Sequence, residues 1–206
     1  MFLSELPSVF VTATDTDAGK TWTSCQVLRR WQARGLSVAA CKPVASGGQW
    51  QGDSLLSEDA LQLAAMTGQH PAEVAPFVFE KPASPHIADT EGQFDLPTCL
   101  QRLAALQSTH DRLLAEGVGG WCVPLSETLM QADLVRASGL PVLLVVPVRL
   151  GCINHALLSA AQIRRDGCRL LGWFANPIEP DFADFTANVA AIERRIQAPR
   201  IRDDAA

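Results

Sequence analysis

The chain has 206 residues, of which 48% are hydrophobic, 19% charged and 6% aromatic, and its formal net charge is -5. This length fits one α/β domain, residues 1–206, and is short for two. The acidic balance, with no basic stripe, argues against nucleic acid as a partner.

The termini and cysteines point to a reducing compartment. The first residues lack a basic region and are interrupted by Glu5 and Pro7, which is not the pattern of a signal peptide. The longest apolar run, 140–148, contains two prolines and is far shorter than a membrane span. We therefore expect a cytoplasmic protein without a membrane partner. The six cysteines show no C-x-x-C spacing, which predicts neither a disulfide nor a zinc site.

The stretch VFVTATDTDAGKTWT, residues 9–23, has the pattern of a phosphate-binding loop. A β-branched and aromatic strand leads into small and acidic residues, and Gly19-Lys20-Thr21 stands where a helix should begin. The generic G-x-x-x-x-G-K-[ST] pattern is incomplete, because Thr14 occupies the place of the first glycine. The alternative is a simple turn with a helix cap, which the strand-loop-helix context disfavours.

The next segments predict a helix over Thr21–Arg34 that stops at Gly35, and a second strand over Leu36–Cys41. The segment Lys42–Gly48 then follows the carboxyl end of a strand, where ligands bind in open α/β sheets. Lys42 is either a solvated lysine or a contact to phosphate or carboxylate. The rigid Pro43 beside it favours the second interpretation.

A polar loop is expected over Gln49–Ser54, and a helix over Glu58–Thr67. Asp59, in the first turn of that helix, either stabilises the helix dipole or binds a metal. Residues 71–85 read as irregular, with a short strand at Val74–Phe79, and they end in a restricted Ser-Pro-His turn.

A second anchor lies at Glu116, which ends an apolar run and precedes a glycine-rich segment with Gly117 and Gly119. In phosphate-loop proteins an acidic residue at this place helps to hold Mg²⁺, and the glycines let the backbone approach the γ-phosphate. The alternative is a glycine-rich turn after an edge strand.

The remaining pattern alternates helices and strands. Helices are expected at Leu96–Gln107, Met130–Ala137, from after His155 to Arg165, and at Phe182–Ile196, and strands at Pro141–Val148 and Leu170–Ala175. Asn176 follows the last strand on the ligand edge. The count predicts a doubly wound, mostly parallel α/β sheet of six or seven strands with helices on both faces, like the P-loop NTPases. This supports a Mg²⁺-nucleotide phosphotransferase or switch.

The order of the motifs resembles dethiobiotin synthetases. These motifs are T-A-T-D-T-D-A-G-K-T, K-P-V-A-S-G, E-D-A-L, S-P-H, E-G-V-G-G-W-x-x-P-L, V-x-L-G-C-I-N-H-A and G-W-x-A-N, across about residues 9–177. The resemblance implies an ATP- and Mg²⁺-dependent cyclo-ligase of biotin synthesis. It joins 7,8-diaminopelargonic acid to CO₂ through a carbamate and a carbamic-phosphoric anhydride, with ATP as co-substrate and release of ADP and phosphate.

The resemblance also implies residue roles. Lys20 holds the β- and γ-phosphates, Lys42 neutralises the carbamate and the transferring phosphoryl group, and Thr16 and Ser46 bind reacting oxygens. Thr21, Asp59 and Glu116 form the Mg²⁺ site. Nucleotide contacts fall on Asp17, Ala18, Gly19, Lys20, Thr21, Glu116, Gly117, Gly119 and Asn176.

A homodimer is implied as well, with the active site at the subunit interface. The loop of Gly151, Cys152, Ile153 and Asn154 receives the substrate carboxylate from the neighbouring subunit, and Asn176 matches the position that reads adenine.

Three features depart from the family pattern. Ala13 stands in place of a glycine, which requires a negative φ there. Asp17 replaces the usual Glu. After Pro199 the chain ends in R-I-R-D-D-A-A, which leads us to expect an open base pocket with relaxed nucleotide selectivity.

Two other classes remain open. A partner-binding switch ATPase of the partition or nitrogenase-iron-protein kind shares the expected fold, but those proteins carry a second lysine inside the phosphate loop, and residues 14–17 contain none. A related amidotransferase-type synthetase domain, or a degenerate homologue that binds nucleotide without turnover, is the other alternative.

Overall fold

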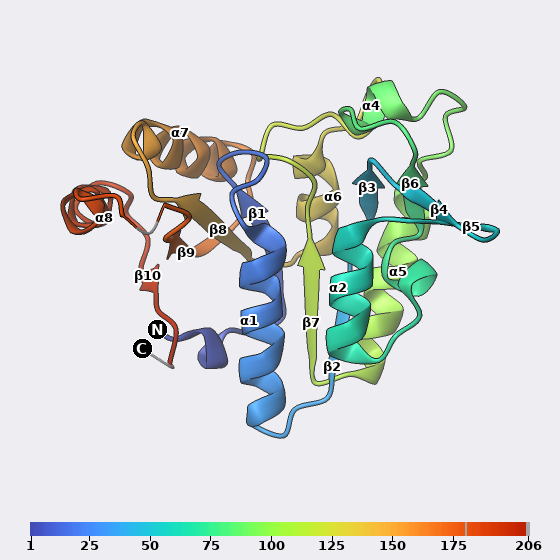
Figure 1. Ribbon diagram of the computed structural model, residues 1–206, viewed down its shortest axis with the longest axis horizontal. Coiled ribbons are helices and arrows are strands. Elements are labelled where there is room, and N and C mark those ends of the chain that lie inside the picture. The colour runs from blue at the N-terminus through green and yellow to red at the C-terminus, as the bar shows by residue number, and fades with distance from the viewer. Residues whose placement is uncertain (180, 205–206) are drawn as a thin grey trace.

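The computed structural model describes residues 1–179 and 181–204. A central sheet of six strands has the order β10-β9-β8-β1-β7-β2, and every neighbouring pair is parallel (Figure 1). The strands are β1 (Val9–Ala13), β2 (Val38–Cys41), β7 (Arg112–Glu116), β8 (Val142–Pro147), β9 (Leu170–Asn176) and β10 (Arg200–Ile201). The predicted fold class is confirmed.

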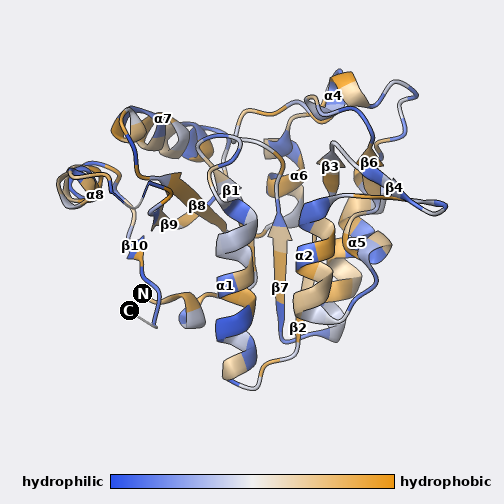
Figure 2. Ribbon diagram, viewed as in Figure 1, coloured by the Kyte–Doolittle hydropathy of each residue, from blue (hydrophilic) through white to orange (hydrophobic). Residues whose placement is uncertain are grey.

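The sheet is buried on both faces, since β1 and β8 have no exposed residue along their lengths. The central strands accordingly consist largely of apolar residues (Figure 2). Alternation along β1 sends Phe10 to one hydrophobic cluster and Val9 and Val11 to the other. The strand therefore joins the two halves of the core.

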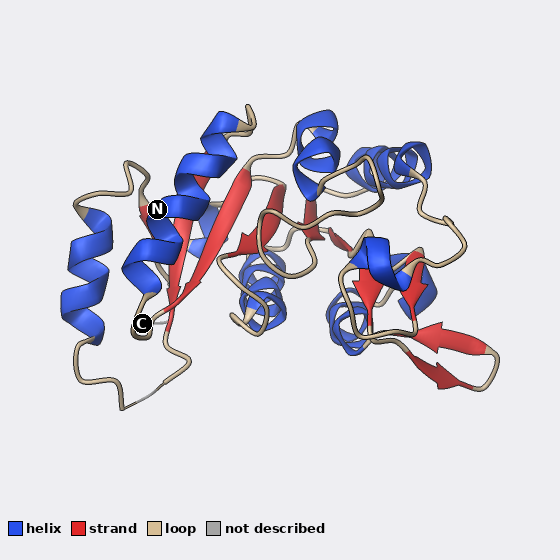
Figure 3. Ribbon diagram, turned by 90° about the horizontal axis from the view of Figure 1, so that it is seen from above, coloured by secondary structure: helices blue, strands red, loops and turns tan. Residues whose placement is uncertain are grey.

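Helices cover each face of this sheet (Figures 1 and 3). One face packs against α1 (Lys20–Ala33), α2 (Glu58–Thr67) and the short 3₁₀ helix η1 (Leu3–Glu5). The other packs against α5 (Leu96–Thr109), α6 (Gln131–Ser138), α7 (Cys152–Arg165) and α8 (Phe185–Glu193). Within the described ranges, no helix has the length and apolar character needed to cross a membrane.

The chain order places a ligand crevice above β1. From β1 the chain passes through α1 to β2 on one side, whereas β8 pairs with β1 on the other side. In such sheets, ligands bind outside the carboxyl ends of strands where the order reverses. The segments that follow β1, β2 and β7 converge there.

The expectation of a polar loop at Gln49–Ser54 is wrong. Strands β4 (Gln49–Gln51) and β5 (Ser54–Leu56) form an antiparallel hairpin, in which Gln51 pairs with Ser54 across the two residues Gly52 and Asp53. Gly52 has a φ of 62°, which suits a two-residue hairpin turn. Because β4 is exposed along its length, it lacks the hydrophobic alternation that would have revealed a strand.

The region 71–85 is more regular than expected, and its strand is shorter. Pro71–Val74 forms helix α3, capped by His70 Nδ1, which accepts a hydrogen bond of 3.3 Å from the Ala72 amide. Proline at the first helical position is already set to the helical φ. Strand β6 covers only Phe77–Phe79 and pairs with β3 (Val44–Ser46), and helix α4 (Pro85–Ala88) follows.

The strand β10 was not predicted. Arg200 and Ile201 pair in parallel with Trp173 and Phe174 of β9, so the terminal segment extends the sheet by one strand. Ala205 and Ala206, at the end of the segment expected to leave the base pocket open, lie outside the described residues.

Gly172 is the position that lets β10 approach β9. A Cβ atom there would lie 2.6 Å from Ile201 Cδ1 and 2.7 Å from the Pro199 carbonyl oxygen. We expect Gly172→Ala to lower the free energy of unfolding by about 1–3 kcal/mol, because an extra methyl overpacks this contact. Urea denaturation measures the change.

The matched background is Ile201→Ala, which removes the side-chain part of that contact. In this background Gly172→Ala should cost less than in the unmodified chain, because the two sites are coupled. Equal costs in both backgrounds would contradict the packing explanation.

Candidate active site

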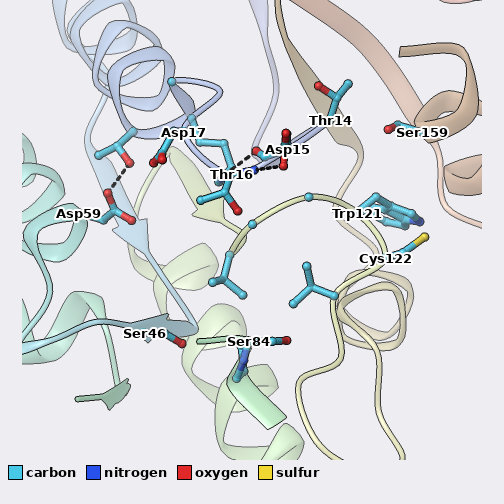
Figure 4. A pocket seen from close by; sticks show the side chains of 18 of the residues that line it. Thr14, Asp15, Thr16, Asp17, Ser46, Asp59, Ser84, Trp121, Cys122 and Ser159 are labelled. Atoms are coloured by element: carbon cyan, nitrogen blue, oxygen red, sulfur yellow. Dashed lines mark hydrogen bonds between the residues drawn. The ribbon is translucent and has the colours of Figure 1, made fainter. Parts of the chain in front are cut away.

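A cleft of about 1220 Å³ opens above the carboxyl ends of the central strands (Figure 4). Its walls come from the phosphate loop, the segment after β2, the start of α2, the segment before α4, the glycine segment after β7, and α7. The lining residues are 14–17, 19–22, Lys42, Ser46, Asp59, Gln62, 82–85, 118–123, Leu158, Ser159 and Gln162. The phosphate loop, the segment after β2, the start of α2 and the glycine segment after β7, all predicted to form the site, thus share one cleft.

The phosphate loop is held by a contact with β9. Asn176 Nδ2 donates a hydrogen bond of 2.9 Å to the Ala18 carbonyl oxygen. Gly19 has a φ of 81°, and a Cβ atom on it would lie 2.0 Å from Asn176 Nδ2. The glycine is therefore required twice, for its backbone conformation and for this close approach. Asp17 also has a positive φ, 54°, which aspartate adopts more readily than most residues.

Ala13 does not disturb this loop. It is the last residue of β1, and among the described non-glycine residues only Asp17 and Gln197 have a positive φ. An alanine in place of the family's glycine requires a negative φ, and the backbone at Ala13 meets this requirement.

Lys20 lies at the start of α1 and is buried. Its Nζ atom is 3.5 Å from the Asp15 carbonyl oxygen, which keeps the ammonium group inside the loop. Burial lowers the pKa of Lys20, and the nearby Lys42 lowers it further. A bound anion would offset the cost of burying this ammonium group, so the position suits a phosphate ligand.

Three oxygen-bearing side chains meet beside the loop, one each from α1, α2 and β7. Thr21 Oγ1 lies 2.7 Å from Asp59 Oδ1 and 2.9 Å from Glu116 Oε1, and Figure 4 shows Asp59 directed to this hydroxyl. Glu116 is fully buried, and its other oxygen accepts a hydrogen bond of 2.6 Å from Ser24 Oγ. The structure brings together the three residues expected to form the metal site.

Lys42 completes this cluster. Its Nζ atom donates hydrogen bonds to Glu116 Oε1 at 2.8 Å and to the Gly117 carbonyl oxygen at 3.3 Å, and it pairs with Asp59. The interpretation of Lys42 as a solvated lysine is wrong, since only 2% of its surface is exposed.

The charge state of the cluster follows from these contacts. Burial acts to lower the pKa of Lys42, but Glu116 and Asp59 outweigh it and raise the pKa. Burial likewise acts to raise the pKa of Asp59, but the Lys42 ammonium outweighs it and lowers the pKa. The pair is therefore an ammonium and a carboxylate.

The glycine segment after β7 is held by Gln131 of α6. Gln131 Oε1 accepts a hydrogen bond of 2.9 Å from the Val118 amide, and its Nε2 donates to the Gly120 carbonyl oxygen at 2.9 Å. The same nitrogen donates to Thr12 Oγ1 at 3.3 Å, which links the segment to β1. Gly117 has no room for a Cβ atom, which would lie 2.4 Å from Gln131 Oε1.

Sequence reasoning missed Ser24 and Gln131. Ser24 carried a signal, because it lies three positions after Thr21 on the same face of a predicted helix. Gln131 carried none, since a glutamine at a helix start is common and its partners are remote in sequence.

The other predicted residues fall into two groups. Thr16, Ser46 and Gly119 line the cleft, and Ser46 Oγ is buried without a hydrogen-bond partner in the described part of the chain. The segment 151–154 does not line it: Gly151 is the N-cap of α7, and Cys152 is buried with its thiol 3.6 Å from Asn188 Oδ1. Ala18, Glu116, Gly117 and Asn176 lie behind the lining.

Comparisons with known proteins identify relatives of the whole chain. A family model described as an AAA domain matches residues 7–201. The ATP-dependent dethiobiotin synthetase BioD of Xanthomonas oryzae pv. oryzae (strain PXO99A) is 43% identical over 197 residues, covering 94% of this chain and 88% of the relative. The one of Yersinia pestis bv. Antiqua (strain Angola) is 45% identical over 194 residues, covering 92% and 81%.

Solved structures share the fold alone. The MinC:MinD cell division protein complex of Aquifex aeolicus aligns with a TM-score of 0.56 at 12% identity, covering 97% of this chain and 82% of that one. A ParA family ATPase from Chlorobium tepidum TLS aligns with a TM-score of 0.55 at 12% identity, covering 97% and 86%. The ordered motifs and the identity along nearly the whole chain lead to one conclusion: the chain belongs to the ATP-dependent dethiobiotin synthetase family.

Proposed function

We propose that this chain is a cyclo-ligase that forms dethiobiotin from 7,8-diaminopelargonic acid, CO₂ and ATP, a step of biotin biosynthesis in the cytoplasm. The observation that carries the proposal is the cluster of Thr21, Asp59, Glu116 and Lys42 beside a phosphate loop. It supplies hydroxyl and carboxylate oxygens for a hard cation and a buried ammonium for a transferring phosphoryl group. Family membership supplies the substrates.

In the proposed reaction, an amine of the substrate captures CO₂ as a carbamate. A carbamate oxygen attacks the γ-phosphorus of ATP, the bond to the ADP oxygen breaks, and a carbamic-phosphoric anhydride forms. The second amine then attacks the carbamoyl carbon and displaces phosphate, which closes the ureido ring. Phosphoryl transfer of this kind depends on positioning and charge neutralisation, so no side chain has to act as a nucleophile.

The phosphate loop and Lys20 bind the triphosphate. The amides of residues 17–21 stand at the start of α1, where the helix dipole favours anions. Lys20 approaches the β- and γ-phosphates from its buried position, and Gly119 lines the cleft on the opposite side, with Gly117 behind it. Glu116 supports the loop from behind through Thr21.

The cluster fits Mg²⁺, for which hydroxyl and carboxylate oxygens are suitable ligands. Thr21 Oγ1 is within hydrogen-bond distance of both carboxylates but has one proton to donate, and Asp59 and Glu116 already share the Lys42 ammonium. The two carboxylates thus share one hydroxyl proton and one ammonium, and their oxygens can bind a further cation. Thr21, Asp59 and Glu116 would hold Mg²⁺, which when bound neutralises the charge that develops on the phosphates.

Lys42 neutralises the carbamate and the transferring phosphoryl group. Thr16 and Ser46 line the cleft near it and donate hydrogen bonds to reacting oxygens. The buried Ser46 hydroxyl without a protein partner supports such a role, since buried polar groups are nearly always hydrogen-bonded.

The site is shared between two subunits in the proposed homodimer. The residues Gly151, Cys152, Ile153 and Asn154 lie at the start of α7, outside their own chain's cleft. The N-terminus of the 14-residue helix α7 attracts a carboxylate. In the proposed dimer, the substrate bound to the neighbouring subunit would place its carboxylate there. Leu150 beside them is 90% exposed and would be covered in such an interface. The adenine-reading role of Asn176 stays a prediction.

A switch ATPase is less consistent with these observations. The phosphate loop lacks a second lysine between Thr14 and Asp17, and the likeness to MinD and ParA proteins concerns the fold alone. Such a protein would hydrolyse ATP without the diamine.

The reaction is tested by ADP release. We expect release that requires Mg²⁺, bicarbonate and 7,8-diaminopelargonic acid together, with a ureido product identified by mass spectrometry. Equal ADP release without the diamine would favour the switch ATPase. Nucleotide binding with no turnover under any condition would favour a degenerate homologue.

Lys42 is expected to act on the transferring group. Lys42→Met should lower the rate of diamine-dependent ADP release by about 100- to 1000-fold, as loss of one such electrostatic donor does. It should also lower stability, because Glu116 is left buried beside fewer partners. Lys81→Met removes a charge from an exposed lysine and should change neither property. A folded Lys42→Met protein with an unchanged rate would contradict the assignment.

Asp59 is expected to act on metal affinity. Asp59→Asn should raise the Mg²⁺ concentration needed for half-maximal ADP release by at least about tenfold, because a charged oxygen ligand is lost. Glu58→Gln is the matched control, since Glu58 stands next to it on the same helix turn and is exposed. If both variants need the same Mg²⁺ concentration as the unmodified chain, Asp59 is only a helix-stabilising residue.

A further inference from the structure

Trp22 follows Thr21 directly and has no role in the chemistry described above. It lines the cleft, and 48% of its surface is exposed. The other tryptophans differ from it: Trp31, Trp121 and Trp173 are buried, and Trp50 is exposed on strand β4, outside the cleft. Trp22 is thus the one tryptophan that presents exposed aromatic surface to the nucleotide cleft.

The position of Trp22 is fixed from the side of β9. Its ring centroid lies 6.2 Å from that of Phe174, and the two rings are tilted by 40°. Phe174 is only 5% exposed and belongs to the core. This buried ring supports Trp22 from one side, while much of the indole surface remains accessible.

Trp22 and the reacting cluster lie on opposite sides of β1. Lys42 follows β2 and Glu116 ends β7, and both strands stand on one side of β1 in the sheet. Phe174 belongs to β9, which stands on the other side. On a helix with 3.6 residues per turn, consecutive side chains point about 100° apart, so Thr21 faces the cluster and Trp22 faces β9.

This arrangement sets the direction of a bound nucleotide. The γ-phosphate must lie at the cluster, because the groups that neutralise its charge are there. The phosphates follow the phosphate loop, so the nucleoside extends away from the cluster, toward the β9 side. The hydrogen bond from Asn176 to Ala18 holds the end of β9 against the loop and therefore keeps this wall in place.

We propose that Trp22 is the stacking platform for the base of the bound nucleoside triphosphate, and this proposal rests on the function proposed above. Every base has a π face, so an indole adds affinity without reading hydrogen bonds. Loss of one such stack typically weakens binding by about 10- to 100-fold. The indole therefore increases the affinity for nucleotides with little selectivity among bases.

The test compares nucleotides with inorganic tripolyphosphate. Calorimetry with Mg²⁺, without diamine or bicarbonate, gives the dissociation constants of ATP, GTP, CTP and tripolyphosphate. Trp22→Ala should weaken ATP, GTP and CTP by about 10- to 100-fold and change tripolyphosphate by less than about twofold. Trp22→Phe should keep most of the affinity, because the π face remains.

Trp50→Ala is the matched control, because it also removes an exposed indole, but from outside the cleft. It should leave all four dissociation constants unchanged and retain the quenching of tryptophan fluorescence by ATP that Trp22→Phe loses. Equal weakening of ATP and tripolyphosphate by Trp22→Ala, or unchanged ATP affinity, would overturn the proposal. This test measures nucleotide binding without diamine or bicarbonate. It therefore remains informative even if the proposed ring-closing reaction does not occur.

Discussion

The site depends on satisfying one buried carboxylate. Glu116 is fully removed from solvent, and a charge in such a place is costly unless it is paired and hydrogen-bonded. Lys42 supplies the opposite charge, and Thr21 and Ser24 supply hydroxyl groups. Because Glu116 ends β7 while its partners come from the segment after β2 and from α1, the requirements of one side chain hold three parts of the fold together.

The same contacts connect stability to chemistry. Lys42 is buried and pairs with Glu116 and Asp59, and these contacts keep it in the cleft beside the phosphate loop, where the proposed reaction needs a positive charge. Gln131 has a comparable role on the other wall, since its amide holds the glycine segment in a fixed conformation. The site is therefore preorganised by contacts that the fold needs in any case.

The cleft has a charged end and an aromatic end. Lys42 and the carboxylates of Asp59 and Glu116 lie on the side of β7 and β2, whereas Trp22, supported by the buried Phe174, lies on the side of β9. A nucleoside triphosphate likewise has charged phosphates at one end and an aromatic base at the other. The order of strands in the sheet thus matches the order of chemical groups in the nucleotide proposed to bind here.

The sequence by itself determined the local features of this protein. The strand, loop and helix around Lys20, the strand that ends at Glu116 and the doubly wound sheet follow from runs of apolar residues and from glycines, which are patterns over a few neighbouring positions. The ordered motifs also identified the family. These features required no knowledge of which segments meet.

Only the tertiary structure decided the contacts between distant segments. Cys41 pairs with Ala115 in the parallel register of β2 and β7, so the next residues, Lys42 and Glu116, are brought side by side across 74 positions of sequence. The hairpin β4–β5, whose first strand is exposed, and the two-residue strand β10 are too short to show a hydrophobic pattern, and they form through turn geometry and pairing with an existing edge. Register and burial are properties of the assembled sheet, which is why Lys42 was only a candidate until the sheet was known.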